Sequence, residues 1–127
     1  MNTTDLGRLG EAKVLAELTA LGYYVFTDLS GKCPVDLIIW KDGVSKTVQV
    51  KSTDSKRYTS WVVQLRSIRP NRSGNTIKLW DPSQVDYLAV YIHAENRVVL
   101  IESASITQTS ALTIQENSVY AIPASLL

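Results

Sequence analysis

Two alternating runs of residues joined at Asp42-Gly43 constrain the fold of this 127-residue chain more than any other feature. An Asp-Gly pair between two β-prone runs is a strong signal for a two-residue hairpin turn. A turn of this length places Asp36 on one strand opposite Gln49 on the other. We therefore predict an antiparallel hairpin with strands at residues 35–41 and 46–52.

The alternation also assigns the side chains of this hairpin to its two faces, because successive residues of a strand point to opposite sides. One face is predicted to be apolar and to lie on the core, with Val35, Leu37, Ile39, Val48 and Val50. The other face is predicted to carry Asp36, Ile38, Thr47, Gln49 and Lys51. A carboxylate, an amide and an ammonium group are thus expected to lie close together away from the main core.

A helix is predicted before the hairpin. Asp5, or one of the two threonines before it, is expected to be the N-cap, and the helix runs to about Leu21, where Gly22 ends it. Four apolar residues gather on one side of this helix: Val14, Leu15, Leu18 and Leu21. Glu11 falls in the middle of that side. It either has a partner near the sheet or lies close enough to the helix start to favour only the helix dipole.

The remaining chain is predicted to consist of strands and loops. The predicted strands are 23–27, 61–65, 87–93 and 97–103, and the last two form a hairpin across residues 94–96. The predicted loops are 28–34 and 67–76, with a turn or short helix opened by Asp81-Pro82-Ser83. From residue 105 onward the pattern is weak, and only 119–122 is predicted to be extended.

Charge is distributed unevenly, although the net charge is only +1. From Lys51 to Lys78 there are seven basic residues and one acid, Asp54, so this segment carries +6 and the rest of the chain carries −5. The segment also contains Tyr58 and Trp61, and this mixture is typical of contacts to phosphates, sugars and base edges. Nucleic acid is the favoured partner, with an acidic protein surface as the alternative. Candidate DNA contacts, including two from the loop before Asp36, are Ser30, Lys32, Lys56, Arg57, Arg66, Arg69 and Arg72.

Several classes of protein are excluded or disfavoured by composition. The single cysteine, Cys33, excludes an internal disulfide and a cysteine-cluster metal site, and the single histidine, His93, disfavours a His-rich zinc site. The longest apolar runs are far shorter than a membrane span, and the N-terminus lacks the basic start and apolar core of a signal peptide. We expect one soluble, cytoplasmic domain over residues 1–127.

The polar face of the hairpin suits metal-assisted hydrolysis of a phosphodiester. Asp36 offers a hard oxygen ligand for Mg²⁺, Gln49 offers a neutral carbonyl oxygen, and Glu11 could add a second carboxylate through water. Lys51 could orient a water nucleophile or stabilise the charge that grows on the attacked phosphate. The alternative interpretation is an internal salt-bridge network of Asp36, Lys51 and Glu11 that only satisfies polar groups beside the core.

Four short motifs in this order resemble the PD-(D/E)XK nuclease superfamily: Gly10-Glu11, Gly22-Tyr23, Pro34–Ile38 and Val48–Lys51. The resemblance implies an α/β (α+β), restriction-endonuclease-like core, with a mixed central sheet flanked by helices. The later hairpin, with Asp86–Tyr91 and Val98–Ile101, is similar to that of small bacterial members linked to group I introns. Archaeal Holliday-junction resolvases share the early motifs.

The resemblance also implies roles for individual residues. Metal would be held by Asp36, Gln49 and the main-chain carbonyl of Val50, Lys51 would assist catalysis, and Glu11 would bind a second metal or position water. Gln49 departs from the Glu or Asp that is usual in the superfamily, although some nuclease members carry Gln there. The implied cofactor is Mg²⁺, with Mn²⁺ able to substitute.

We therefore expect a Mg²⁺-dependent, site-specific double-strand DNA endonuclease of the intron-homing kind. The alternatives are a Holliday-junction resolvase, a restriction-like nuclease, or a DNA-binding protein of the same fold that is inactive because of Gln49. A domain of this size has one candidate active site, whereas a double-strand break needs two cuts, so we expect a homodimer or tetramer. Residues 98–101 and 121–127 are the candidate interface segments, unless they belong to the core.

Overall fold

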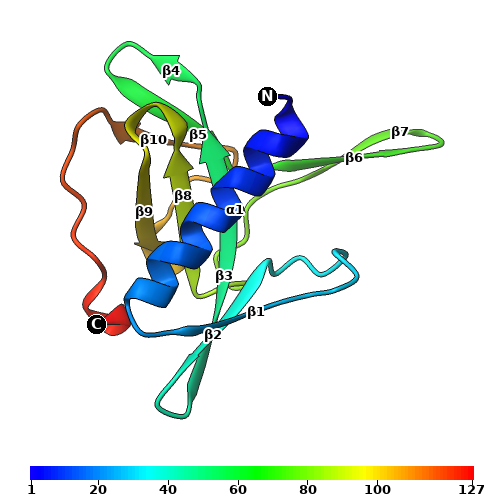
Figure 1. The fold of residues 1–127 in the computed structure, drawn as a ribbon. Helices are drawn as coiled ribbons and strands as arrows, with labels where there is room; N and C mark the ends of the chain where they lie inside the picture. Colours follow the sequence, from blue (N-terminus) through cyan, green and yellow to red (C-terminus); the bar gives the residue numbers. More distant parts are fainter.

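A five-stranded mixed sheet forms the centre of the molecule (Figure 1). The computed structural model describes the backbone of residues 1–127 and every side chain except those of Ile68–Asn71 and Asn75. The sheet has the order β1-β2-β3-β8-β9, in which β3 and β8 are parallel and the other neighbours are antiparallel. Its strands are β1 (Tyr24–Thr27), β2 (Leu37–Lys41), β3 (Val44–Thr53), β8 (Tyr87–Ile92) and β9 (Arg97–Glu102).

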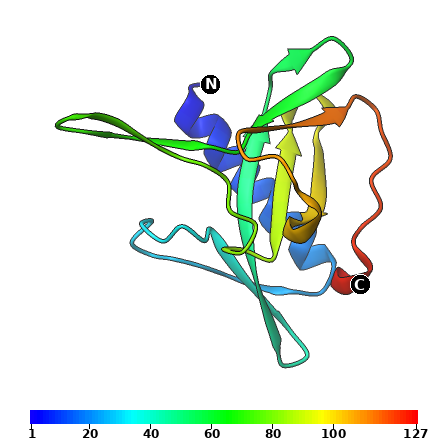
Figure 2. The same ribbon diagram turned by 180° about the vertical axis from the view of Figure 1, so that it is seen from behind.

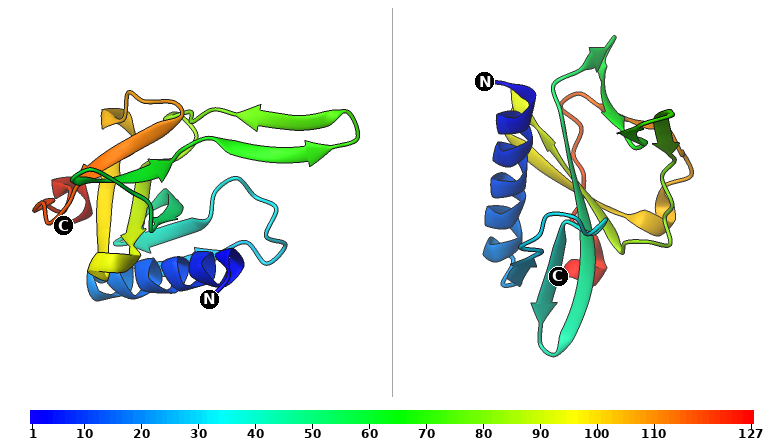
Figure 3. Two further views of the ribbon diagram at one scale, coloured as in Figure 1. Left: turned by 90° about the horizontal axis from the view of Figure 1, so that it is seen from above. Right: turned by 90° about the vertical axis from the view of Figure 1, so that its right-hand side faces the viewer.

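One face of this sheet is covered by the helix α1 (Thr3–Ala20), as Figure 3 shows from the side. Val14 and Leu18 are completely buried in a cluster with the apolar residues of β2 and β3. The predicted helix and its end are confirmed, but two details are wrong. Asn2, not Asp5, caps the N-terminus, because its side chain accepts a hydrogen bond from the Asp5 amide. Leu15 is 45% exposed and is not part of the core cluster that contains Val14 and Leu18.

The opposite face of the central sheet is covered by a second, three-stranded sheet of order β10-β5-β4 (Figures 1 and 2). Its strands are β4 (Lys56–Arg57), β5 (Ser60–Gln64) and β10 (Ala111–Gln115). All six residues of β8 are buried because this strand lies between the two layers. The prediction of a sheet flanked by helices is therefore corrected: over the described backbone one α-helix covers one face and strands cover the other. None of the helices described is long and apolar enough to cross a membrane.

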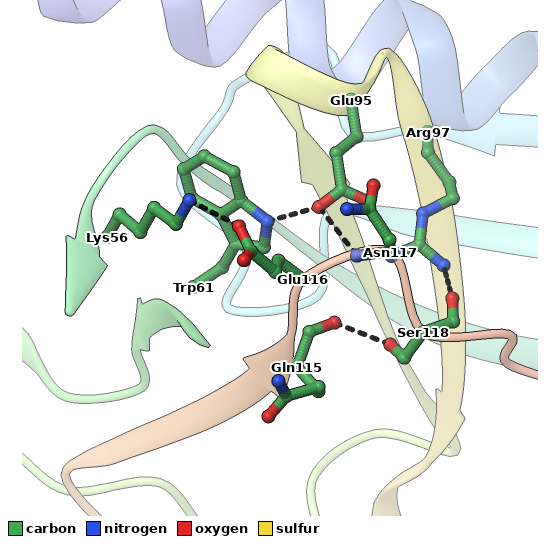
Figure 4. A network of polar contacts seen from close by, with 8 residues as sticks. All are labelled: Lys56, Trp61, Glu95, Arg97, Gln115, Glu116, Asn117 and Ser118. Carbon is green, nitrogen blue, oxygen red and sulfur yellow. Dashed lines mark hydrogen bonds and ion pairs between the residues drawn. The ribbon is translucent and has the colours of Figure 1, made fainter. Parts of the chain in front are cut away.

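A polar network ties the second sheet to the turn after β8 (Figure 4). The Glu95 carboxylate accepts hydrogen bonds from the Trp61 indole N–H of β5 and from the Asn117 amide, which follows β10. Arg97 pairs with Glu95 at 2.8 Å, and Lys56 pairs with Glu116. The contacts hold three segments that are distant in sequence against one another.

The described backbone also contains short 3-10 helices at His93–Glu95, Ser103–Ser105 and Ala124–Leu126.

The hairpin predicted around Asp42-Gly43 is confirmed as β2–β3. Both turn residues have positive φ angles, 51° and 82°, as a type I′ turn requires. Lys41 therefore pairs with Val44, and Leu37 pairs with Val48. The apolar residues of the two strands are buried against α1, with one difference. Val35 precedes β2 and packs against the second core cluster, which lies between the two sheets.

Two other predictions are wrong. The predicted loop 67–76 is largely a two-stranded ribbon, formed by β6 (Ser67–Asn71) and β7 (Gly74–Lys78). Proline and glycine in this stretch favoured a loop, but a ribbon with two free edges tolerates both. The predicted extended segment 119–122 has no regular structure. The strand of this region is β10, which was not predicted.

The hairpin of β8 and β9 is confirmed, with Asn96 in the left-handed region at its turn.

Candidate active site

Asp36 stands directly before β2 and is fixed to β3 by two hydrogen bonds. The Gln49 side-chain nitrogen Nε2 and the Val50 backbone amide each donate to Asp36 Oδ2 at 2.8 Å. The opposition of Asp36 and Gln49 expected from the two-residue turn therefore occurs. In this arrangement Gln49 presents its nitrogen to the carboxylate, so its carbonyl oxygen is not the atom that faces Asp36.

Lys51 lies on the same face of β3 as Gln49 and is half-buried. Burial lowers the pKa of Lys51, although the negative charge of Asp36 acts in the opposite direction. Burial likewise raises the pKa of Asp36, against the effects of the Val50 amide and of the Lys51 charge. Desolvation therefore outweighs attraction for both groups. Among the described side chains Lys51 makes no ion pair within 4.0 Å, so the salt-bridge network of the alternative interpretation does not form.

Glu11 is brought toward this site by a close approach of α1 to β3. A Cβ atom added to Gly10 would lie 3.0 Å from Ser52 Cβ and 3.6 Å from Tyr91 Cβ. Gly10, not Glu11, thus faces the sheet, and Glu11 is exposed at the edge of the contact. The prediction that Glu11 occupies the middle of the apolar side is corrected for this reason. Partial burial of its carboxylate and the charge of Asp36 raise the pKa of Glu11.

A pocket of about 170 Å³ contains Asp36, Gln49 and Lys51. Glu11 does not line it. The other lining residues come from the loop before β2, from the base of the β6–β7 ribbon and from the segment before β8: Cys33, Pro34, Leu65, Ser67, Lys78, Leu79, Trp80, Asp81, Gln84 and Val85. Sequence reasoning missed the last two groups, since they reach the pocket only through tertiary packing.

The loop 28–34 is organised by the side chain of Asp28. Its carboxylate accepts hydrogen bonds from the amides of Ser30, Lys32 and Cys33 and from the Ser30 hydroxyl, at 2.6 to 3.1 Å. These bonds, led by the one from the Ser30 hydroxyl, lower the pKa of Asp28 to about 2. Ser30 and Lys32 are exposed beside the pocket and do not line it. Sequence reasoning missed Asp28, although an Asp followed two residues later by Ser is a turn signal.

The other predicted DNA contacts lie on two hairpins. Arg57 is exposed on β4, whereas the Lys56 ammonium is paired with Glu116 and lies 5.5 Å from the centre of the Trp61 ring. Arg66 and Arg72 are exposed at the base and the turn of the β6–β7 ribbon. The side chain of Arg69 lies outside the described residues.

The donor groups of the site fit a hard divalent cation. No group of three His, Cys, Asp or Glu side chains that could hold a metal occurs among the described residues. Oxygen donors of the kind that Mg²⁺ prefers are nevertheless present: the Asp36 carboxylate and the Gln49 amide in the pocket, and the Glu11 carboxylate outside its lining. Burial and, after it, the charge of Asp36 raise the pKa of Glu11, and a cation near both carboxylates would relieve the second of these effects.

The sequence and the fold have counterparts among known proteins. Residues 1–121 match a family model described as PD-(D/E)XK endonuclease. The structure is similar to that of a bacterial homing endonuclease, I-Ssp6803I, with a TM-score of 0.79 and 20% sequence identity over 98% of this chain and 86% of that chain. A search of curated proteins gives no match. At this identity the structural likeness shows the fold, so the expected restriction-endonuclease-like α+β fold is confirmed.

Proposed function

The chain belongs to the PD-(D/E)XK endonuclease family, and from this premise we propose that it is a metal-dependent endonuclease that hydrolyses phosphodiester bonds of double-stranded DNA. One observation carries the assignment of the site. Asp36, Gln49 and Lys51 line a single pocket, and Asp36 is held by hydrogen bonds from the strand that carries the other two. Such an arrangement is preorganised for phosphate chemistry, because its polar groups need little movement to meet a substrate.

We propose Mg²⁺ as the cofactor, with Mn²⁺ able to substitute. Asp36, Gln49 and the Val50 carbonyl would hold the ion, and Glu11 would act through water or a second ion. A divalent cation at such a site activates water and neutralises charge on the phosphate. Gln49 must turn its amide to offer its oxygen, because it now presents Nε2 to Asp36.

Lys51 is proposed to stabilise the negative charge that develops on the attacked phosphate. Its ammonium is half-buried and has no ion-pair partner among the described side chains, so its charge is available to a bound anion. A charge in a water-poor pocket acts more strongly than one in bulk water. The same ammonium can orient the attacking water.

The biological role that we propose is intron homing at a specific DNA site. The fold shared with a homing endonuclease supports this role. A junction resolvase or a restriction-like enzyme is the alternative within the class, and cleavage of four-way junctions regardless of sequence would favour the resolvase.

One observation favours a second candidate, an inactive DNA-binding protein. The position of the usual acidic ligand holds the neutral Gln49, which is bonded to Asp36 through its nitrogen. Tight DNA binding without cleavage in Mg²⁺ or Mn²⁺ would favour this candidate.

Cleavage of linear and branched duplexes in Mg²⁺, Mn²⁺ or EDTA tests the proposed activity. Lys51→Ala should abolish cleavage, as should Asp36→Asn. Asp42→Asn is a matched control, since it removes one carboxylate from the same hairpin and Asn-Gly suits the same turn. It should cut like the wild type. Unchanged cleavage in both pocket variants would contradict the assignment of Asp36 and Lys51 to the active site.

A further inference from the structure

The β6–β7 ribbon stands apart from the rest of the fold. It forms a two-stranded sheet of its own and projects away from both larger sheets (Figures 1 and 3). Its pairing runs from Ser67 with Lys78 to Asn71 with Gly74, and Arg72 and Ser73 make the turn. A two-stranded hairpin without further packing is only marginally stable in water. Its retention as a projecting element therefore suggests a partner that covers it.

The base of the ribbon is part of the catalytic pocket. Ser67 and Lys78, which pair at the start of β6 and the end of β7, line the same pocket as Asp36 and Lys51. A phosphate bound in this pocket therefore lies at the point from which the ribbon extends. Lys78 places a second ammonium group beside the position of that phosphate.

The charge of the ribbon suits a polyanion. No acidic residue occurs in the sequence from residue 55 to residue 80. Arg66, Arg72 and Lys78 are exposed at its base and its turn. Positive charge alone suits either DNA or an acidic protein. DNA is favoured here, because the proposed substrate of the adjoining pocket is itself DNA.

We propose that the β6–β7 ribbon enters the DNA groove beside the scissile phosphate and reads base pairs there, with Arg72 at its turn contacting base edges. The inference rests on the proposed nuclease function. The major groove, about 12 Å wide, admits a two-stranded ribbon. Five residues at about 3.4 Å each span about 17 Å. With about 3.4 Å between successive base pairs, the turn reaches about five base pairs from the cleaved bond.

Photo-crosslinking tests the position of the ribbon without requiring cleavage. Benzoylphenylalanine at position 73, in the turn, should crosslink to a duplex in EDTA, mainly at bases within about five pairs of the bond that is cut in Mg²⁺. The control label replaces Val119, which is 97% exposed in the C-terminal segment on the opposite side of the molecule (Figures 1 and 3). Equal crosslinking from both positions, or none from position 73, would overturn the proposal, and an acidic protein would then be the better partner.

Cleavage of a pool of random duplexes, sequenced at the cut ends, tests base reading. Arg72→Ala should reduce the preference near the cut by roughly 5- to 150-fold, the usual range for one well-placed base contact. Arg8→Ala, which removes an exposed arginine of α1 that is not among the predicted DNA contacts, should leave the profile of preferences unchanged. A uniform loss of cleavage across all sequences in Arg72→Ala would identify a phosphate contact and overturn base reading. Crosslinking from position 73 without cleavage by the wild type would contradict the nuclease function and leave the ribbon as a DNA contact.

Discussion

The carboxylate of Asp36 is the most constrained group of the pocket, since one of its oxygens accepts two hydrogen bonds at 2.8 Å. Its raised pKa means that the folded state binds a proton more tightly than the unfolded state does. The contribution of Asp36 to the free energy of unfolding is therefore fully present below the ordinary pKa. It is lost as the pH rises through the raised pKa. At neutral pH the charged Asp36 costs the fold free energy, as is expected of a group that serves a ligand.

Asp36→Asn is expected to abolish cleavage while keeping DNA binding intact or tighter, because one negative charge near the phosphates is removed. The melting temperature should not fall, since asparagine can still accept from the Val50 amide and carries no buried charge. If Asp36 were instead one half of a buried salt bridge, the change would cost about 3 to 5 kcal/mol. Calorimetry and cleavage on the same sample distinguish the two cases.

Gln49→Glu is expected to keep measurable cleavage and to tighten Mg²⁺ binding by adding a charged ligand. Without metal the variant should be less stable than the wild type, because it loses the Gln49 donor and places two carboxylates together. The melting temperature should then rise with Mg²⁺ more steeply than in the wild type. Gln108→Glu, the same change at an exposed position outside the pocket, is the control. Equal metal dependence in the two variants would contradict a metal site at Gln49.

The pH dependence of cleavage should follow the shifted groups of the site. Activity should rise as Asp36 and Glu11 ionise, over a range above their ordinary pKa values, and fall as Lys51 loses its proton, below its ordinary value of 10.5. Lys51→Arg should move the alkaline fall to higher pH, since arginine stays protonated. The measurement is kcat/KM against pH, with DNA binding followed in parallel. An alkaline limb that is identical in Lys51→Arg would mean that another group controls it.

At the scale of elements, the contact of α1 with β3 depends on a residue without a side chain. Gly10→Ala places a methyl group 3.0 Å from Ser52 Cβ, so α1 and β3 must move apart by a few tenths of an ångström. Overpacking costs about 1 to 3 kcal/mol, against about 1 kcal/mol gained from the helix propensity of alanine. We expect a net loss of stability and reduced cleavage, because Glu11 moves with the helix. Gly7→Ala is the control, since its Cβ would meet nothing within 4 Å.

Gly7→Ala should raise the free energy of unfolding by up to about 1 kcal/mol and leave cleavage unchanged. Chemical denaturation of both variants gives the comparison. A stability gain of equal size in Gly10→Ala would show that α1 does not approach β3 as closely as the structure has it.

The elements that could be predicted from sequence are those encoded locally. Asp36 and Gln49 could be paired because one turn fixes the register between them, and Lys51 follows from strand parity. The strand β10 and the ribbon could not be predicted, because polar, proline-containing or glycine-containing stretches become strands only when the fold supplies a partner strand. The part of the pocket that includes Trp80 and Gln84 was missed for a different reason: it reaches β3 by tertiary packing, from a segment about 30 residues later in the chain.

At the scale of the whole molecule, two layers pack on the central sheet, and the described residues form one candidate active site at the β2–β3 hairpin. Of the segments expected at an interface, 98–101 belongs largely to the core, where Val99 and Leu100 are 1% and 5% exposed. In 121–127 Leu126 is completely buried, whereas Leu127 is 75% exposed. The core thus accounts for most of the apolar residues that had suggested an interface.

We nevertheless expect a homodimer or tetramer, because a double-strand break needs two cuts from chains that each carry one site. Analytical ultracentrifugation with and without duplex DNA should give a mass of at least two chains. A mutant chain with Lys51→Ala, mixed with the wild type, should convert double-strand breaks into nicks. A monomer mass on DNA, combined with breaks of both strands in one encounter, would rule this assembly out.

The ribbon continues into the remainder of the chain at its two paired ends, Ser67 and Lys78, while the groups proposed for hydrolysis lie on a hairpin earlier in the chain. Mutations in the ribbon can therefore accumulate without disturbing the core, whereas mutations around residues 36–51 cannot. Over evolutionary time such a gene could acquire new target sites while its chemistry is inherited unchanged. Related genes should accordingly diverge faster over 68–77 than over 36–51, and recombination that exchanges the ribbon alone should transfer the preference of one lineage to another.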